Sequence, residues 1–340
     1  KAAEAAGDKF SLKPVCAGPY KFVERVPQDR IVVERFPDYW NKDHVFIDKI
    51  TYLPIVDSTV RLANLRSGGL DMMERLLATD IKTVRDDAKL RLSKAVSLGF
   101  FSLLVNVANG PKADNPLGKD PRVRQALALS IDREALNQVV FNGEFVPGNQ
   151  WVSPQSPWYQ QAFPIPKRDI AKAKVLMKEA GVTGRVPIDF MIGNNPETRA
   201  VAEVVQSMAA EAGFDLKIRV VEAATGLKAA EEGDFQLYEN NWSGRIDPDG
   251  NTVLYQTCGS PLNTGRYCDK QIDEWHREAR ASNDFATRKA VYEKIAAKFL
   301  PEGWMIYLFH PQYLIAHTAK LEGFKPMPDG LIRVMDVKLK

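Results

Sequence analysis

The stretch DFQLYENNWSGRIDPDGN, residues 234–251, passes from strand-like to turn-like sequence within a few positions. Residues 234–240 alternate in side-chain direction, which predicts a short strand with Leu237 and Tyr238 on opposite faces. The Ser-Gly, Asp-Pro and Asp-Gly pairs that follow favour a loop at the carboxyl end of that strand. In open α/β sheets, ligands bind at this edge. The stretch therefore predicts a sheet strand followed by a candidate binding loop.

The predicted loop carries side chains that can hold a small molecule. Trp242 can form an apolar or stacking wall, and Arg245 can bind an anion through its fork of donors. An ordinary turn is the alternative, in which Arg245 pairs with Asp247 or Asp249. The ligand contacts predicted here are Trp242, Ser243, Gly244, Arg245, Asp247 and Tyr238.

Strand-like and helix-like segments alternate upstream of this stretch. VPIDFMIGN (186–194) and FDLKIRVVEA (214–223) have strand patterns. Between them, residues 196–212 form an amphipathic helical pattern with Val201 and Val205 on one face. This β-α-β-α-β order predicts an α/β fold whose parallel or mixed sheet carries helices on both faces.

The N-terminal part of the chain predicts a further β-α-β unit and one more ligand contact. GPYKFVERV (18–26), DRIVVERF (29–36) and IDKITYLPIV (47–56) have strand patterns. Asp57 is positioned to cap a short helix that ends at Gly68. The strand DMMERL follows, and its edge places Glu74 where it can face a cleft.

Two segments further along the chain suggest a domain crossing and a packed loop. The apolar strand FFSLLVNV (100–107) is followed by the polar, turn-rich NGPKADNPLGKDP, where we place a crossing between domains. Asp120, Asp132 and Asp169 each precede a helical pattern and are predicted N-caps. The proline-punctuated loop 148–166 contains Trp151, which is predicted to line a pocket, with plain packing as the alternative.

Length and composition exclude several classes of protein. The chain has 340 residues, 45% hydrophobic and 26% charged, which suits a globular protein of about two domains. The net charge of +3 is too weak and dispersed to favour nucleic acid or an anionic membrane as partner. No apolar run approaches the ~20 residues of a membrane span, and no signal peptide is visible, so none was made or it was removed.

The three cysteines bear on the cellular compartment. Cys258 and Cys268 lie ten positions apart around a Pro/Gly/Asn-rich turn that can bring them together. We expect a disulfide between them and hence an oxidising compartment, with two free thiols as the alternative. Cys16 has no obvious partner.

Catalytic and metal-binding motifs are not found in the sequence. It contains no HExxH, GxSxG, Walker A loop or GxGxxG after a strand. We therefore expect no metal and no cofactor. The alternative function is a hydrolase that uses Asp247 and Asp249 as acid and base.

Several segments in the same order resemble the family 5 extracellular solute-binding proteins of ABC transporters, the dipeptide, oligopeptide and nickel type. The resemblance spans nearly the whole chain. The segments that carry it are GPYKFVE with DRIVVERFPDYW, RLANLRSGGLDM, VNVANGP with DPRVRQALALSIDREAL, AKAKVLMKEAG, and GDFQLYENNWSGRIDPDGN.

The resemblance implies a two-lobed, type II periplasmic-binding-protein-like fold with mixed sheets flanked by helices. Lobe I would comprise residues 1–107 and 308–340, and lobe II residues 108–307, with crossings near Asn106 and Phe309. Asn106 joins the predicted ligand contacts. Family members are longer, so the chain resembles their C-terminal two thirds, with lobe I incomplete.

The resemblance also implies a function. Such a protein is a periplasmic or membrane-tethered monomer without enzymatic activity, which closes on a small solute or peptide by hinge bending and delivers it to permease subunits in the membrane. In peptide-binding members, an aspartate soon after the tryptophan pairs with the ligand's amino terminus. Here Arg245 holds that place unless a gap brings Asp247 into it. With Arg245 at this position, an anionic group is predicted on the ligand. Peptide, opine, glutathione-like and sugar-derived ligands all remain open.

Overall fold

The computed structural model describes residue 4 and residues 7–340, and the chain forms two compact units. Unit 1 comprises residues 1–95 and 313–340, and unit 2 comprises residues 96–312. The chain therefore passes between the units at residues 95/96, before the expected crossing near Asn106, and at residues 312/313, just after the expected crossing near Phe309. The buried strands that contain or adjoin these residues pair with each other inside unit 2, so the chain crosses before the first strand and after the second.

Unit 2 is built on a six-stranded mixed sheet with the order β7-β11-β6-β10-β8-β9. Its strands are Phe100–Val105 (β6), Val146–Pro147 (β7), Val186–Gly193 (β8), Phe214–Val221 (β9), Leu237–Trp242 (β10) and Met305–His310 (β11). β8 pairs in parallel with both β9 and β10, whereas β6 pairs antiparallel with β10 and β11. The mixed sheet predicted from the β-α-β-α-β order is confirmed.

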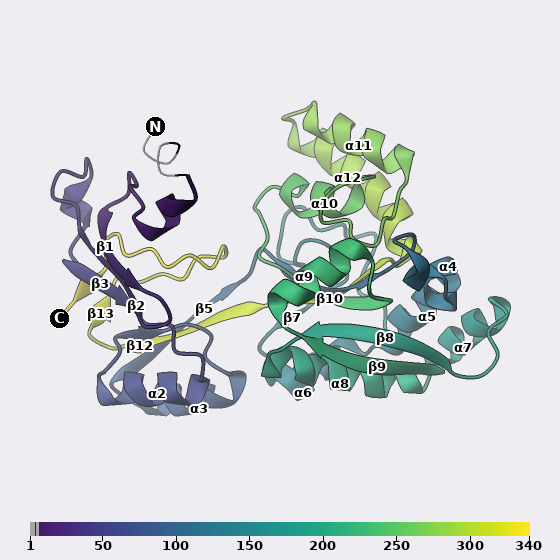
Figure 1. The fold of residues 1–340 in the computed structure, drawn as a ribbon, viewed down its shortest axis with the longest axis horizontal. Coiled ribbons are helices and arrows are strands. Elements are labelled where there is room, and N and C mark those ends of the chain that lie inside the picture. The colour runs from purple at the N-terminus through teal and green to yellow at the C-terminus, as the bar shows by residue number, and fades with distance from the viewer. Residues whose placement is uncertain (1–3, 5–6) are drawn as a thin grey trace. The chain divides into compact units, whose positions relative to one another are not determined.

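Helices cover both faces of this sheet (Figure 1). They are Pro116–Lys119 (α4), Pro121–Ser130 (α5), Arg133–Phe141 (α6), Ile170–Glu179 (α7), Pro196–Ala210 (α8), Ala223–Glu232 (α9), Asp249–Gln256 (α10), Lys270–Arg280 (α11) and Phe285–Phe299 (α12). The caps predicted from sequence are formed, because the Asp120, Asp132 and Asp169 side chains accept bonds from backbone N–H groups of the first turns.

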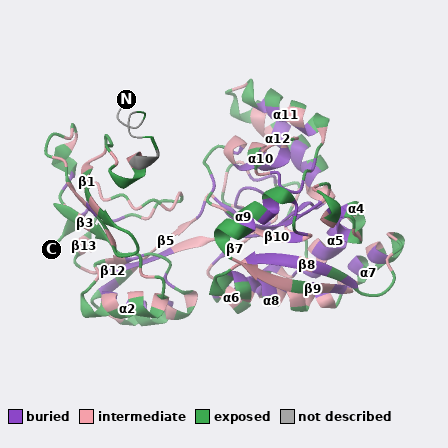
Figure 2. Ribbon diagram, in the orientation of Figure 1, coloured by how far each residue is buried: buried purple, intermediate pink, exposed green. Residues whose placement is uncertain are grey.

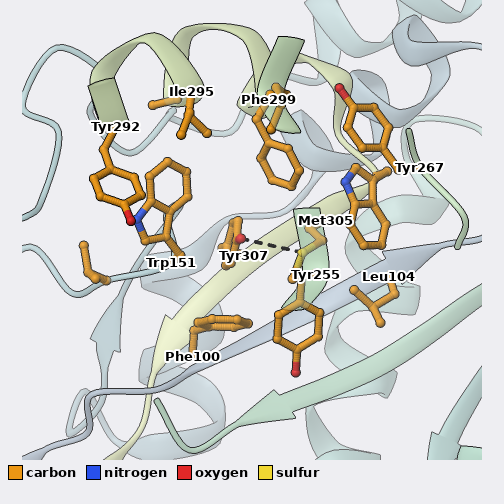
Figure 3. Close-up of a cluster of buried hydrophobic side chains, with 14 of the residues drawn as sticks. Phe100, Leu104, Trp151, Tyr255, Tyr267, Tyr292, Ile295, Phe299, Met305 and Tyr307 are labelled. Carbon is orange, nitrogen blue, oxygen red and sulfur yellow. Dashed lines mark hydrogen bonds between the residues drawn. The ribbon is translucent and has the colours of Figure 1, made fainter. Parts of the chain in front are cut away.

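One hydrophobic core of unit 2 lies between the sheet and helices α9 to α12, and buried residues of α5, α6 and α8 belong to the rest of its interior. Every residue of β6 and β11 is buried, as strands covered on both faces require. Figure 2 shows buried residues along β8, while exposed residues lie mainly on the outer helices and loops. Aromatic rings fill the space above them, including Trp151, Tyr292 and Phe299 (Figure 3).

Unit 1 contains two small sheets, β1-β2-β3 and β4-β12-β5. Its strands are Tyr20–Val26 (β1), Arg30–Arg35 (β2), Lys49–Tyr52 (β3), Met72–Met73 (β4), Leu90–Val96 (β5) and Gln312–Thr318 (β12), with a short pair Leu321–Glu322 (β13) and Lys338–Leu339 (β14). Its helices are Ser58–Ser67 (α2) and Ile81–Asp86 (α3). The predicted helix start and end are confirmed: the Asp57 side chain accepts from Val60 N, and Gly68 has φ 84°.

The disulfide predicted between Cys258 and Cys268 is formed, and it closes the turn between α10 and α11. Because the bond limits the unfolded chain, replacing both cysteines by serine should lower the free energy of unfolding by roughly 2–3 kcal/mol. Urea unfolding of the double variant and the parent measures this. Cys16→Ser is the matched control, since Cys16 is exposed and unbonded. An unchanged midpoint in the double variant would contradict the stabilising role.

Candidate functional site

The candidate loop lies between β10 and α10. Trp242 is the last residue of β10 and pairs with Phe100 of β6, so the strand runs two residues further than predicted. Helix α10 begins at Asp249, which leaves residues 243–248 as the loop. Since β10 and β8 are parallel, the loop sits at their shared carboxyl edge, as expected for a ligand site.

One buried amide organises this loop. The Oδ1 atom of Asn251 accepts hydrogen bonds from Trp242 Nε1 at 2.9 Å and from the backbone N of Arg245 at 2.7 Å. Its Nδ2 atom donates to the Arg245 carbonyl at 3.0 Å. Asn251 is fully buried. A single side chain therefore fixes both the indole orientation and the backbone of the arginine.

Arg245 extends over Trp242, with its Cζ atom 4.9 Å from the ring centroid, which is a cation–π geometry. Its Nη1 atom donates to the Gly244 carbonyl at 2.6 Å and to Ser243 Oγ at 3.3 Å. Within the described part of the chain, no carboxylate forms an ion pair with Arg245. The exposed guanidinium therefore keeps donors available for an anion.

The two loop carboxylates pair with other arginines, so the alternative of a turn closed by Arg245 is wrong. Asp247 receives both Arg288 Nη atoms at 2.7 Å, and Asp249 receives Arg280 Nε at 2.7 Å. These pairs tie the loop to α12 and α11. Hydrogen bonding from Arg288 lowers the pKa of Asp247. Both carboxylates are thus occupied by arginines, which argues against the hydrolase alternative.

Two glycines let the loop lie directly on the chain that leads into β6. Gly244 is buried, with φ 79°, and a methyl group there would overlap the backbone of Leu98 and Gly99. A methyl group on Gly99 would in turn overlap the Trp242 carbonyl. The Gly99 carbonyl also lies 2.7 Å from His310 Nδ1, in the adjacent strand β11. The loop is thereby fixed against two segments next to the domain crossing.

Two tyrosines of the flanking elements and one apolar loop residue add to the candidate site. Tyr255 meets the Trp242 ring edge-on, with centroids 5.5 Å apart, and donates its hydroxyl to Asn240 at 3.3 Å. Tyr238 is half-buried on β10, and burial raises its pKa to about 12. Ile246 is 79% exposed. The loop therefore presents a cation beside apolar surface.

Two predicted ligand contacts belong to the interior of unit 2 instead. Asn106 is fully buried. Its Nδ2 donates to the carbonyls of Asn109, Gly233 and Phe235, so this amide links two backbone segments and has no donor left for a ligand. Trp151 is fully buried and packs near Tyr292, with ring centroids 6.3 Å apart (Figure 3). We therefore correct both predictions, because neither side chain reaches the surface in this structure.

Glu74 belongs to unit 1, where it follows β4 and is exposed. It lines a hollow within that unit together with Tyr52 and residues 330–333. Of the other predicted contacts, Trp242, Ser243, Gly244, Arg245 and Asp247 lie at the end of β10 and in the loop that follows, and Tyr238 lies earlier on β10.

Five residues of the site were not predicted from the sequence: Asn251, Arg280, Arg288, Gly99 and Ile246. Asn251 had a usable signal, because a polar residue three positions into a helix after a turn is placed to bond back to that turn. The arginines act across 31 and 41 positions, which no local pattern reveals.

A mixed sheet covered by helices, with a rigid polar loop at its carboxyl edge, defines a ligand-binding α/β protein. The model of bacterial extracellular solute-binding proteins, family 5 Middle, matches residues 1–264, and the chain belongs to this family.

Similar proteins agree with that assignment. The chain is 29% identical to a glutathione-binding protein of Pectobacterium atrosepticum, over 98% of this chain and 66% of that protein. It is 27% identical to di/tripeptide-binding protein 2 of Pseudomonas aeruginosa, over 99% of this chain and 64% of that protein. It thus spans slightly less than two thirds of these relatives.

The fold is also that of a solved relative. The oligopeptide-binding protein AppA from Bacillus subtilis, in complex with a nonapeptide, matches with a TM-score of 0.83 and 25% identity. That match covers 100% of this chain and 70% of the other. The expected type II periplasmic-binding-protein-like fold is confirmed.

No helix in the described residues combines the length and the apolar character needed to cross a membrane.

Proposed function

We propose that this chain belongs to the solute-capturing component of an ABC importer, which binds a small peptide-like solute with an anionic group and passes it to membrane permease subunits. The observation that carries the proposal is Arg245, an exposed guanidinium held in place by Asn251 and left without a carboxylate partner among the described residues. Relatives that bind glutathione and short peptides support the ligand class.

The loop geometry favours a carboxylate over an ammonium at this position. A carboxylate would meet two or more N–H donors of Arg245, whereas an ammonium would meet a like charge. Trp242 and Ile246 would provide apolar surface beside the charged group. Ser243, Gly244, Asp247 and Tyr238 complete the proposed contacts, with Asp247 acting through its pair with Arg288.

The same proposal places the protein outside the cytoplasm, in the periplasm or tethered to the membrane, and as a monomer without enzymatic activity. Its family of extracellular binding proteins and its Cys258–Cys268 disulfide support that compartment. No nucleic acid and no cofactor is expected to take part.

Replacing Arg245 by alanine should weaken binding of such a solute by roughly 1–3 kcal/mol, because a charged hydrogen bond is lost. A thermal-shift screen with glutathione, dipeptides and tripeptides first identifies ligands, since binding to the native state raises apparent stability. Isothermal titration of each hit and of its carboxamide, against the parent and Arg245→Ala, then measures the effect.

Arg185→Ala is the matched control, because Arg185 is an exposed arginine of unit 2 outside the loop. The proposal requires that the Arg245 variant lose affinity for the carboxylate form but little for the carboxamide. Equal affinity of parent and Arg245→Ala for every hit would refute the anion contact.

A further inference from the structure

Unit 1 contains two adjoining hollows that share Tyr52, Ile332 and Arg333. The first, of about 420 Å³, is lined mainly by apolar side chains: Pro19, Tyr20, Val33, Ile50, Ile332, Val334 and Met335. The second, of about 380 Å³, adds Glu74, Gly330 and Leu331. Here the first hollow is the apolar chamber, and the second, which adds the Glu74 carboxylate, is the polar chamber.

The floor of the apolar chamber is one face of the β1-β2-β3 sheet. Val33 of β2 pairs with Ile50 of β3, and Tyr52 lies two positions further along β3, on the same face. The Tyr20 hydroxyl donates to the Ile47 carbonyl at 3.0 Å, which holds its ring beside them. The chamber therefore rests on paired strands rather than on loops.

The C-terminal segment 330–335 forms the opposite wall and is fixed at both ends. At one end, Gly330 N donates to the Met327 carbonyl at 2.9 Å and Leu331 N to Asp329 Oδ1 at 3.1 Å. At the other, Asp336 N donates to the His44 carbonyl at 2.8 Å, while the two side chains pair at 2.6 Å. The segment therefore begins at a local turn and is tied at its far end to His44, in the connection between β2 and β3.

The charges around the polar chamber leave one carboxylate uncompensated. Arg333 donates to both oxygens of Asp329, at 2.8 and 2.7 Å, and this pairing lowers the pKa of Asp329 to about 2. That pair is neutral as a whole. Glu74 takes part in no ion pair within residues 7–340. The pKa of Tyr52 is raised mainly by its burial and further by the negative charge of Glu74.

The backbone that carries Glu74 is held in an unusual conformation. Arg75 has φ 53°, which is sparsely populated for a residue with a side chain. Arg61 supports it, because its Nη2 donates to the Arg75 carbonyl at 3.2 Å while its Nη1 binds the Ile55 and Val56 carbonyls at 2.7 Å. Arg61 thus fixes the segment that carries Glu74 relative to the chain after β3.

We propose that these hollows bind a primary ammonium group that carries an apolar substituent, as at the amino end of a peptide with an apolar first side chain. Glu74 receives the ammonium, the Tyr52 hydroxyl accepts a further hydrogen bond, and the substituent enters the chamber over Val33 and Ile50. A carboxylate beside apolar walls has this complementarity. The inference rests on the proposed function for the ligand class, but not on Arg245.

Three small probes test the two halves of this site separately. They are 3-methylbutylammonium, 3-methylbutanol as its uncharged match, and methylammonium as the cation without the apolar group. Methyl-labelled NMR spectra of the chain follow Ile50, Ile332 and Met335, which line the hollows, and Val139, which is exposed in unit 2. We expect 3-methylbutylammonium to shift the signals of Ile50, Ile332 and Met335 and to leave that of Val139 unchanged. Its affinity should be at least several-fold higher than that of 3-methylbutanol or methylammonium.

Glu74→Gln removes the charge and keeps the shape, and should weaken 3-methylbutylammonium roughly tenfold or more, because a charge-assisted hydrogen bond is lost. Asp43→Asn is the matched control, an exposed carboxylate of the same unit outside the hollows. Equal shifts with 3-methylbutanol, or a Glu74→Gln affinity within twofold of the parent, would overturn the proposal.

The outcome is separable from that of the anion contact. Because the probes contain no carboxylate, Arg245→Ala should leave their affinity unchanged. If Glu74→Gln loses probe binding while Arg245→Ala keeps its affinity for every carboxylate ligand, the ammonium site is upheld and only the anion contact is refuted.

Discussion

Replacing Gly244 by alanine should lower the free energy of unfolding by about 3 kcal/mol or more. The added methyl group meets the backbone of Leu98 and Gly99, which cannot rotate away as a side chain can. The positive φ of 79° adds a steric penalty of about 1–2 kcal/mol. Chemical denaturation of the parent and the variant gives the difference.

Gly259→Ala separates the two contributions. Gly259 also has a positive φ, 73°, in unit 2, but a methyl group there meets nothing within 4 Å. Gly259→Ala should lower the free energy of unfolding by only about 1 kcal/mol, because the positive φ is its only penalty. If Gly244→Ala were no less stable than Gly259→Ala, the close contact between the loop and the start of β6 would be disproved.

Helices and the sheet of unit 2 were predictable because their signals are local. The Asp57, Asp120, Asp132 and Asp169 caps each sit beside the first turn that they stabilise, and the structure shows all of them. Strand patterns for β8 and β9 were equally explicit, since Val, Ile and Phe alternate between turn residues. The parallel order then followed from the helices between them.

The division into units was not predictable from the same signals. β6 and β11 are continuous apolar runs, and such a run shows that a strand is buried without showing which sheet it joins. The prediction assigned all of β6 to lobe I, whereas its pairing with β10 and β11 places it at the centre of unit 2.

The candidate site divides in the same way. The residue types of the loop predicted an anion-binding surface, and Arg245 is exposed as required. Its partners could not be assigned, because two aspartates close by in sequence pair instead with arginines from α11 and α12. Trp151 was misjudged since an aromatic residue in a proline-rich loop has no periodic neighbours that reveal its burial.

Asn251→Ala should remove the internal support of the binding loop. Three polar groups lose their partner at once: the Trp242 indole N–H and the backbone N–H and carbonyl of Arg245. Leaving buried or half-buried groups unpaired costs about 1–3 kcal/mol each, so we expect a total loss of about 3 kcal/mol after water replaces part of the bonding. Denaturant unfolding measures the total, and the indole N–H signal of Trp242, identified by its disappearance in Trp242→Phe, reports on the loop itself.

Thr252→Val is the matched control for this prediction. Thr252 is the next residue, is also fully buried, and donates to the Pro248 carbonyl at 2.9 Å. Loss of this hydrogen bond in Thr252→Val should lower the free energy of unfolding by about 1 kcal/mol and leave the indole signal of Trp242 unchanged. In Asn251→Ala that signal should move and exchange faster with solvent, and affinity for a carboxylate ligand should fall even where the protein is fully folded. An unmoved indole signal in Asn251→Ala would show that Trp242 and Arg245 hold their positions without the amide, and the loop would then owe its rigidity to the Arg280 and Arg288 pairs alone.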